Sequence, residues 1–521
     1  MTTQNNERGM AIVIALFLMA ILTALGTSLM FLSQTETYAS MNYRMMSQAR
    51  YAAEAGVQKA SNFLLDSAQY SVTPVDAANA ALFNRTVSPV TYNGNPVILS
   101  ANLSAQAANY PVTAVQTAFN AAVNGTLPAG NATLTYTAYA KLQSMQVFDS
   151  YGGGQEVIQT WEITSTGGLG ANHNATVEVV ALVETPKVPA NTYAAFATND
   201  TCGALEFSGH VDINSYDSTN YAGATVPTMD ASGGNVGTNG NLHLIGGANV
   251  DGNLYTPRVG VGTCASGSVD AYTGVLSHVD SIVRLPAVVV YPTPPVPMWS
   301  TTPDPGNITS TVNACTSLFG GAPPGAVTCA ENVGANSITI DGHGSTVSLP
   351  QVALGGGINL KLVASHPPAQ YNFNSIKLMG GATVGVSATG PTQGVLVDVV
   401  GKDSAGAVLT APHLPIDLVG GTFAQVTGCA ATCSNFDASM LQFIYSGTTE
   451  IDITGNAGAA AVFYAPNAPV VFSGTADLYG SVLGKTVNNV GNANIHYDRR
   501  LMHDFYVIGH PMVGTFSWKR Y

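Results

Sequence analysis

The chain opens on a long hydrophobic run that begins after nine mostly polar residues. Met10 to Leu32 contains no charged residue. At about 1.5 Å per helical residue, this run can cross a hydrocarbon core of about 30 Å. It exceeds the hydrophobic region of a cleaved signal peptide, and no small-residue cleavage site follows it. The pattern therefore predicts a transmembrane helix preceded by a leader over residues 1–9.

The helical pattern continues past the hydrophobic run to about residue 65. Residues 33–68 contain one Gly and no Pro. Arg50 and Glu54 are four residues apart and can pair on one helix face. Larger or apolar residues recur on another face at steps of three and four, namely Tyr38, Met41, Met45, Ala49, Ala52, Gly56, Ala60 and Phe63. We expect one helix over 10–65 whose distal half packs against another element.

Strand patterns follow the helix and define a small sheet domain over 66–187. Three runs, 132–148, 156–166 and 174–184, are separated by Gly-rich turns. They predict an antiparallel sheet that lies on the helix. The chain is therefore of the α+β class.

From about residue 191 the sequence pattern changes to short β runs that alternate with turns rich in Gly, Asn and Asp. A turn signal about every eight to twelve residues fits either a parallel β-helix or a β-sandwich. We favour a β-helix over 188–500, because the last part packs several short strands closely with small residues at the corners. A Pro-rich stretch, 284–306, predicts an excursion outside the stack that extends to about residue 335. Residues 501–521 are expected to form a C-terminal tail.

Composition narrows the possible functions. The chain has 521 residues, of which 17 are Lys or Arg and 30 are Asp or Glu, so 9% are charged. Globular proteins average about 25%. A hydrophobic content of 46% argues against disorder. A net charge of -13 argues against a nucleic-acid partner, which would require a basic face.

Six cysteines occur, all in the distal part of the chain, which suits an oxidising exterior and an N-terminus on the cytoplasmic side. Six cysteines allow fifteen connectivities. By proximity we expect a tight Cys429–Cys433 loop, with Cys315–Cys329 and Cys202–Cys264 as further candidate pairs.

Candidate catalytic chemistry is sparse. Asp341-Gly342-His343-Gly344 superficially resembles the Gly-His-Gly of pectin-cleaving hydrolases. Those enzymes need converging carboxylates, and no Asp-Asp pair occurs in the chain. We therefore interpret His343 as a turn residue. The histidines lack metal-ligand spacing, and we predict a protein that is not an enzyme, with no cofactor and no metal.

The segment MNYRMMSQARYAAEAGVQKA, residues 41–60, resembles the N-terminal region of PilX-type minor pilins of the type IV pilus. Tyr51, Ala53, Glu54 and Ala55 are its most diagnostic residues. The run over 161–184 and the ending FSWKRY also resemble these pilins. The region from 188 resembles the C-terminal β-solenoid of large PilX-type surface proteins.

The resemblance implies a maturation pathway. A prepilin peptidase would cut after Gly9, and the new N-terminus, Met10, would be methylated. The helix would hold the subunit in the inner membrane until the pilus assembly machinery moves it into an extracellular filament of pilin subunits. Major pilins of this kind carry Glu at the fifth mature position, which is Ile14 here. A minor or tip subunit is therefore favoured.

The expected role of the β-rich region is adhesion or surface contact, with host or surface glycans as possible partners. Three alternatives remain open. One is a pseudopilin of a type II-like secretion system. Another is the major pilin of a filament with unusually large subunits. The third is a membrane-tethered β-helix enzyme acting on polysaccharides.

Overall fold

The chain folds into two compact units in a computed structural model. The helix-sheet unit comprises residues 1–148, 155–186 and 508–521, and the β-rich module comprises 149–154 and 187–507. The structure describes residues 7–66, 69–70, 82–129, 132–151, 154–169, 175–265, 267–365, 369–388, 394–420, 423–427, 433–454, 456, 458–503, 505–508 and 512–520.

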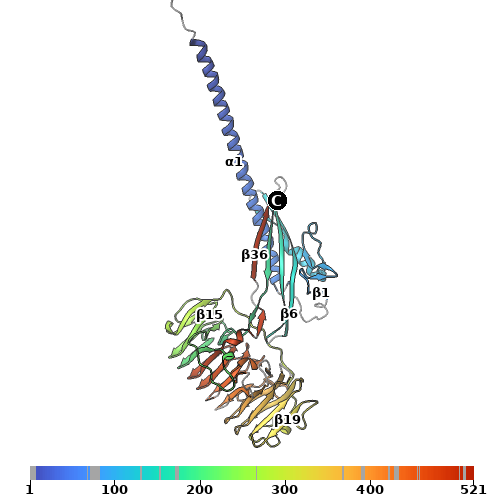
Figure 1. Ribbon diagram of the computed structural model, residues 1–521, viewed down its shortest axis with the longest axis vertical. Coiled ribbons are helices and arrows are strands. Elements are labelled where there is room, and N and C mark those ends of the chain that lie inside the picture. The colour runs from blue at the N-terminus through green and yellow to red at the C-terminus, as the bar shows by residue number, and fades with distance from the viewer. Residues whose placement is uncertain are drawn as a thin grey trace, which may run out of the picture. The chain divides into compact units, whose positions relative to one another are not determined.

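The helix-sheet unit is built on α1, a single helix over Glu7–Leu65. Its distal half lies along an antiparallel sheet with the strand order β36-β8-β7-β6-β4, and β5 pairs with β6 (Figure 1). The remaining elements of the unit are a short helix and a small three-stranded sheet. The bounds are β1 Phe83–Asn84, β2 Thr91–Tyr92, β3 Asn95–Pro96, β4 Ile98–Ser100, α3 Thr113–Val123, β5 Asn124–Ala129, β6 Ala132–Ser150, β7 Gly154–Leu169, β8 Thr176–Glu184 and β36 Met512–Arg520.

Alternation of side chains explains why the sheet carries the helix on one face. In β8 every second residue is buried, from Val177 to Val183, and β7 adds Trp161 and Ile163 to the same core. Phe63 of α1 meets Phe119 of α3 edge-on, with ring centroids 5.3 Å apart. The expected long helix and small antiparallel sheet are therefore both present.

The C-terminal residues, which the sequence indicated as a tail, form the edge strand β36. It pairs antiparallel with β8 from Met512 opposite Glu184 to Arg520 opposite Val177. Without β36, this edge of β8 would expose unpaired backbone groups. The β-rich module is thus an insertion between β8 and β36, and β9 (Lys187–Pro189) pairs with β35 (Tyr506–Ile508) where the chain enters and leaves it.

The module is a stack of short strands whose pairings are parallel, apart from the antiparallel β19–β20 pair. Most strands pair with strands two or three positions away along the chain, as successive coils of a parallel β-helix do; an antiparallel sandwich would pair neighbours. A first block of strands covers β10 Ala195–Ala197, β11 Leu205–Gly209, β12 Asp212–Tyr216, β13 Val236–Thr238, β14 Leu242–Gly246, β15 Asn249–Thr256, β16 Tyr272–Thr273 and β17 Val279–Arg284.

A second block of strands builds the rest of the stack. Its bounds are β18 Asn307–Ile308, β19 Thr328–Asn332, β20 Ser337–Asp341, β21 Val347–Leu354, β22 Asn359–Val363, β23 Ala369–Leu378, β24 Thr383–Ser387, β25 Val395–Val399, β26 Ile416–Val419, β27 Phe423–Thr427, β28 Leu441–Tyr445, β29 Ile451–Thr454, β30 Gly458–Ala465, β31 Val470–Gly474, β32 Asp477–Gly484, β33 Val487–Gly491 and β34 Asn494–Asp498. Short helical turns lie between them: α4 Ala314–Phe319, η1 Ser218–Asn220, η2 Leu276–His278, η3 Ala438–Met440 and η4 Arg499–His503.

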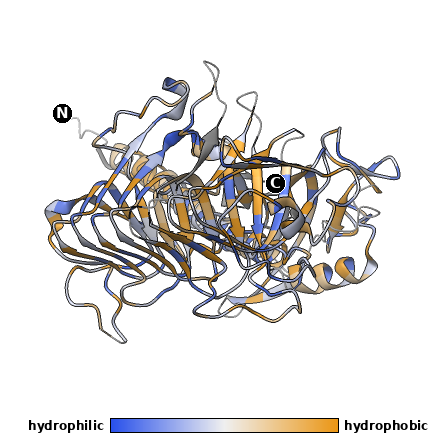
Figure 2. Cartoon of the chain, turned by 90° about the horizontal axis from the view of Figure 1, so that it is seen from below, coloured by the Kyte–Doolittle hydropathy of each residue, from blue (hydrophilic) through white to orange (hydrophobic). Residues whose placement is uncertain are grey.

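The order of the coils differs from the order of the chain. β10, β11 and β12 pair with β32, β33 and β34, so the last coil lies directly beneath the first (Figure 1). The chain therefore enters in the middle of the stack and winds to one end at β17. It then crosses to the opposite end at β18 and winds back to the middle at β34. Hydrophobic and hydrophilic residues alternate along these strands (Figure 2).

The crossing segment, residues 285–306, is the Pro-rich excursion, and we call it the strap. It ends earlier than the sequence indicated, because Asn307 and Ile308 already pair with Ala353 and Leu354 of β21. Residues 307–335 instead form the end of the stack, with α4 and the antiparallel pair of β19 and β20.

Candidate functional site

The N-terminal half of α1 is an apolar rod that no described part of its own chain covers. Residues 10–43 are all exposed among the residues that the structure describes. Met10–Leu65 is long and apolar enough to contain a membrane span. An uncovered hydrophobic surface of this size is a site for lipid or for other helices.

Polar side chains within the rod bond to the helix itself. The Thr23 hydroxyl donates to the Met19 carbonyl at 2.8 Å, and Ser28 donates to Ala24 at 2.8 Å. Thr27, Thr35 and Thr37 make the same bond to the residue four positions earlier. Hydroxyls paired in this way can enter an apolar medium without leaving an unsatisfied group.

Tyr38 and Met41 are also exposed, which corrects part of the predicted packing stripe; Tyr43 and Tyr51, which lie outside that stripe, are exposed as well. The helix packs on the sheet only from about Met45 onward, so Tyr38 and Met41 lie on the part of α1 that extends beyond it.

The segment of α1 that resembles PilX-type pilins, residues 41–60, includes the point where the helix packs most closely on the sheet. Ala49 and Ala53 are fully buried, while Ala55 is half-buried. A Cβ atom added to Gly167 of β7 would lie 2.1 Å from the Ala49 carbonyl oxygen and 2.4 Å from the Ala53 nitrogen. The backbones of helix and strand therefore touch, and only small residues fit on both sides.

Glu54 does not enter this buried contact. Its carboxylate accepts a hydrogen bond from Arg50 Nε at 2.7 Å across one helical turn, as predicted. Both side chains are partly exposed, so the pair contributes little to stability. The Arg50–Glu54 pair places charge on the side of α1 that faces away from the sheet.

The strap is pinned to the side of the module by two buried asparagines. Asn239 accepts from the Val289 N–H and donates to the Val289 carbonyl, both at 2.8 Å. Asn374 does the same to Ser300, again at 2.8 Å for both bonds. Asn239 follows β13 of the first block and Asn374 lies in β23 of the second, so the strap ties the two blocks together.

Apolar and polar contacts support the strap between these two pins. The Tyr464 hydroxyl donates to the Pro292 carbonyl at 2.7 Å, and the ring of Tyr291 lies 5.0 Å from that of Phe196. Lys402 Nζ lies 4.8 Å from the centroid of the Trp299 ring. Phe196 and Tyr464 are both buried where they contact the strap, so the strap helps to cover the core.

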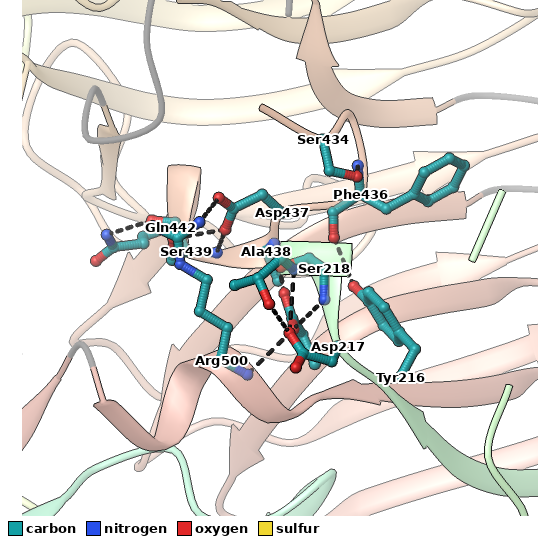
Figure 3. A network of polar contacts seen from close by, with 12 residues as sticks. Tyr216, Asp217, Ser218, Ser434, Phe436, Asp437, Ala438, Ser439, Gln442 and Arg500 are labelled. Atoms are coloured by element: carbon teal, nitrogen blue, oxygen red, sulfur yellow. Dashed lines mark hydrogen bonds and ion pairs between the residues drawn. The ribbon is translucent and has the colours of Figure 1, made fainter. Parts of the chain in front are cut away.

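A second buried polar network joins the first and last coils, and we call it the seam. Asp498 at the end of β34 is fully buried and accepts from the backbone N–H groups of Ser218 at 3.1 Å and Arg500 at 3.2 Å. Arg500 also forms an ion pair with the buried Asp437, and the Tyr216 hydroxyl donates to the Phe436 carbonyl at 2.6 Å (Figure 3). Burial raises the pKa of Asp498 to about 7.

His343 sits in a turn, in agreement with our interpretation. It adopts a φ of 46°, and its N–H donates to Asp341 Oδ1 at 2.8 Å. Asp341 also accepts from Ser365 Oγ at 2.6 Å, so its carboxylate is engaged within the turn. Across the described residues, no group of three His, Cys, Asp or Glu side chains could hold a metal ion.

The structure pairs Cys202 with Cys264 and Cys315 with Cys329, the two pairings that proximity indicated. Cys433 is disulfide-bonded as well, whereas Cys429 lies outside the described residues. Gly9 and Met10, the expected processing residues, lie in the first turns of α1.

Residues 8–58 match the family described as PilX N-terminal, so this part of the chain is similar to PilX-type N-terminal regions. Residues 418–503 match a domain of unknown function, DUF7305, which contains the seam residues Asp437, Asp498 and Arg500. The comparison with curated proteins found no match.

Among solved structures, the crystal structure of the competence-associated pilin ComZ from Thermus thermophilus is similar at 12% sequence identity. The alignment covers 92% of this chain and 98% of that chain, with a TM-score of 0.24. A score this low does not establish a common fold.

Proposed function

We propose that the protein is a type IV pilus-like minor or tip pilin that displays its β-rich module on a surface filament. The observation that carries this proposal is α1, whose PilX-type sequence coincides with an exposed apolar rod and a small-residue seat on the sheet. Such a rod is stable in the inner membrane and equally stable among the helices of a filament, because both surroundings are apolar.

The first helical turns support a minor or tip position. No carboxylate occurs between Met10 and Thr35, and the fifth residue after Gly9 is Ile14. A free terminal amine buried in a filament core is costly without a counter-charge. A subunit that lacks this carboxylate docks poorly onto a neighbour beyond it, so it is favoured at an end of the filament or as a rare component.

The module is suited to contact at the cell surface. It has the strand pairing of a parallel β-helix, contains the Cys202–Cys264 and Cys315–Cys329 disulfides, and stacks uncharged polar residues such as Ser337, Asn359 and Thr383 in register. Its two connections to the helix-sheet unit leave from neighbouring coils in the middle of the stack, at β10 and β34. We propose adhesion or surface contact through this module, with glycans as candidate ligands.

The test is the mature N-terminus measured by mass spectrometry on membranes and on sheared filaments. We expect the chain to begin at Met10 with one added methyl group. Gly9→Val should block cleavage, remove the protein from filaments and lower cell attachment to surfaces. Gly26→Val is the matched control, because a Cβ there meets nothing within 4 Å and processing should proceed. Filaments that contain chains starting at residue 1, or cut elsewhere, would contradict the proposal.

A further inference from the structure

One ladder of the stack places a lysine beside two acids. Lys377 of β23 lies in register with Asp417 of β26, and Asp417 lies in register with Asp452 of β29. Neighbouring strands are about 4.8 Å apart, so the three side chains project side by side. The next residues of the ladder are apolar, namely Ala353 beside Lys377 and Val471 beside Asp452. Within this ladder, the three charged groups can therefore pair only with one another.

The amine and the central carboxylate are in direct contact. Lys377 Nζ lies 2.5 Å from Asp417 Oδ2, and the side chains are 38% and 8% exposed. Because Oδ2 is bonded to the carboxyl carbon Cγ, the amine nitrogen lies next to the carbon that an amide bond would join. Holding a nucleophile against its electrophile in this way lowers the entropic barrier to reaction.

An ion pair between Lys377 and Asp417 does not account for Asp452. The Oδ1 atom of Asp452 is buried and has no hydrogen-bond partner among the described residues. Burial and the neighbouring Asp417 carboxylate raise the pKa of Asp452 to about 6. A protonated carboxyl at this position can donate to an oxygen of Asp417, which makes the Asp417 carbon more electrophilic. The buried carboxyl of Asp452 then gains the partner that it lacks beside an ion pair.

We infer that Lys377 and Asp417 form an intramolecular isopeptide bond, with Asp452 as the proton donor. The Lys377 ammonium first gives a proton to the Asp417 carboxylate, which produces a neutral amine and a neutral acid. The amine nitrogen then attacks Cγ, while Asp452 lends a proton to one Asp417 oxygen and recovers it when the intermediate collapses. The bond from Cγ to the other oxygen breaks, and that oxygen leaves with two protons as water. One ammonium and one carboxylate thus become one amide and one water, and no oxidant, reductant or other reactant takes part.

The isopeptide bond ties successive coils of the stack together. It joins β23 to β26, which pair in parallel, and it links residues that are 40 positions apart in the chain. Unlike the Cys315–Cys329 disulfide at the end of the stack, it survives a reductant. The bond concerns the module alone, so it does not rest on the proposed pilin function.

The test is tandem mass spectrometry of a tryptic digest of the reduced full chain. An unmodified chain is cut after Lys361 and Lys377, which releases residues 362–377 as a free peptide. The isopeptide bond blocks cleavage after Lys377, so we expect residues 362–402 joined to 403–485 and lighter by the mass of one water. On a denaturing gel with reductant, the cross-linked chain should migrate faster than an open chain, because it keeps an internal loop.

Single variants separate the roles of the side chains. Lys377→Arg keeps the charge beside Asp417 but replaces the amine with a guanidinium that stays protonated, so the bond and the loss of water should disappear. Asp452→Asn removes the proton donor and should leave most chains open. Lys361→Arg is the matched control, because Lys361 is also half-buried in a strand but lies opposite uncharged residues on both neighbouring strands. Its cross-link between Lys377 and Asp417 should match that of the wild type.

Two results would overturn the inference. Release of residues 362–377 as a free peptide from the wild type would show that Lys377 and Asp417 form an ion pair and nothing more. Equal cross-linking in the wild type and in Asp452→Asn would remove the proton donor that distinguishes this ladder from an ordinary ion pair.

Discussion

Asn374 gives the sharpest test of the strap. Its side chain is fully buried and makes two 2.8 Å bonds to the backbone of Ser300. Asn374→Ala removes both bonds and leaves the N–H and C=O of Ser300, a residue that is 8% exposed, without partners. An unsatisfied buried polar group costs about 1–3 kcal/mol, so the free energy of unfolding should fall by about 2–6 kcal/mol.

Thermal unfolding and hydrogen exchange measure this effect. With about 2 °C per kcal/mol for a large unit, the unfolding midpoint should fall by roughly 4–12 °C. Backbone exchange should accelerate over the strap, residues 285–306, before it accelerates in the strands beneath. The matched control is Asn467→Ala. Asn467 bonds to Thr293 at 3.1 Å from a partly exposed position, where water can replace it. Its cost should stay below about 1 kcal/mol.

The reasoning would be refuted if Asn374→Ala shifted the midpoint no more than Asn467→Ala. Unchanged protection of the strap would refute it equally, since the buried amide would then hold nothing in place. Asn239→Ala offers an independent repeat, because Asn239 holds Val289 through the same pair of bonds on the other block. The two losses should add to within about 0.5 kcal/mol if the pins are independent.

Three further outcomes follow from the structure. Gly167→Ala should lower the free energy of unfolding of the helix-sheet unit by about 1–3 kcal/mol or more. Gly168→Ala should cost far less, because the nearest atom to its added Cβ would be 3.4 Å away. Equal unfolding midpoints for the two variants would contradict the close contact between helix and strand. The raised pKa of Asp498 in the folded state makes the wild type lose stability between about pH 4 and 7. Asp498→Asn should therefore gain stability relative to wild type as pH rises from 5 to 8. A difference between the two melting points that does not change with pH would count against a buried carboxyl. The double variant Cys315→Ser, Cys329→Ser should lower the free energy of unfolding of the α4 end by about 3 kcal/mol, as measured by denaturant unfolding of the oxidised wild type and the variant. Adding a reductant to the variant should not destabilise that end further.

Periodicity was sufficient to predict the elements with strong local patterns. The three strand runs of the small sheet and the long helix were found at nearly their observed bounds, because alternation and a helical stripe are local properties. Tyr38 and Met41 were misassigned to a packed face, since the sequence does not say where the sheet beneath the helix ends. Small residues at 49, 53 and 56 did indicate a close contact.

The pairing of strands that lie far apart in the chain could not be predicted from the sequence. β36 joins β8 across more than three hundred residues, and β10 stacks on β32 at a similar distance. The local sequence of these strands does not identify the strand that each one pairs with, because parallel strands of similar alternation are interchangeable. The strap was recognisable as Pro-rich and extended, but Asn239 directly follows a strand and Asn374 lies within one, and neither stands out in the sequence. Only their paired bonds to Val289 and Ser300 distinguish them from other buried asparagines such as Asn241 and Asn489.

The low charge of the chain follows from this stacking. In a parallel ladder each side chain lies directly above the equivalent residue of the next coil, so like charges would meet at the spacing of neighbouring strands. One such ladder contains Lys377, Asp417 and Asp452 in register. Lys377 is bonded to Asp417, and burial together with Asp417 raises the pKa of Asp452 to about 6. A repeated acid in one ladder is thus unfavourable, so uncharged residues such as Asn, Thr, Ser and Gly are favoured on the faces of the stack.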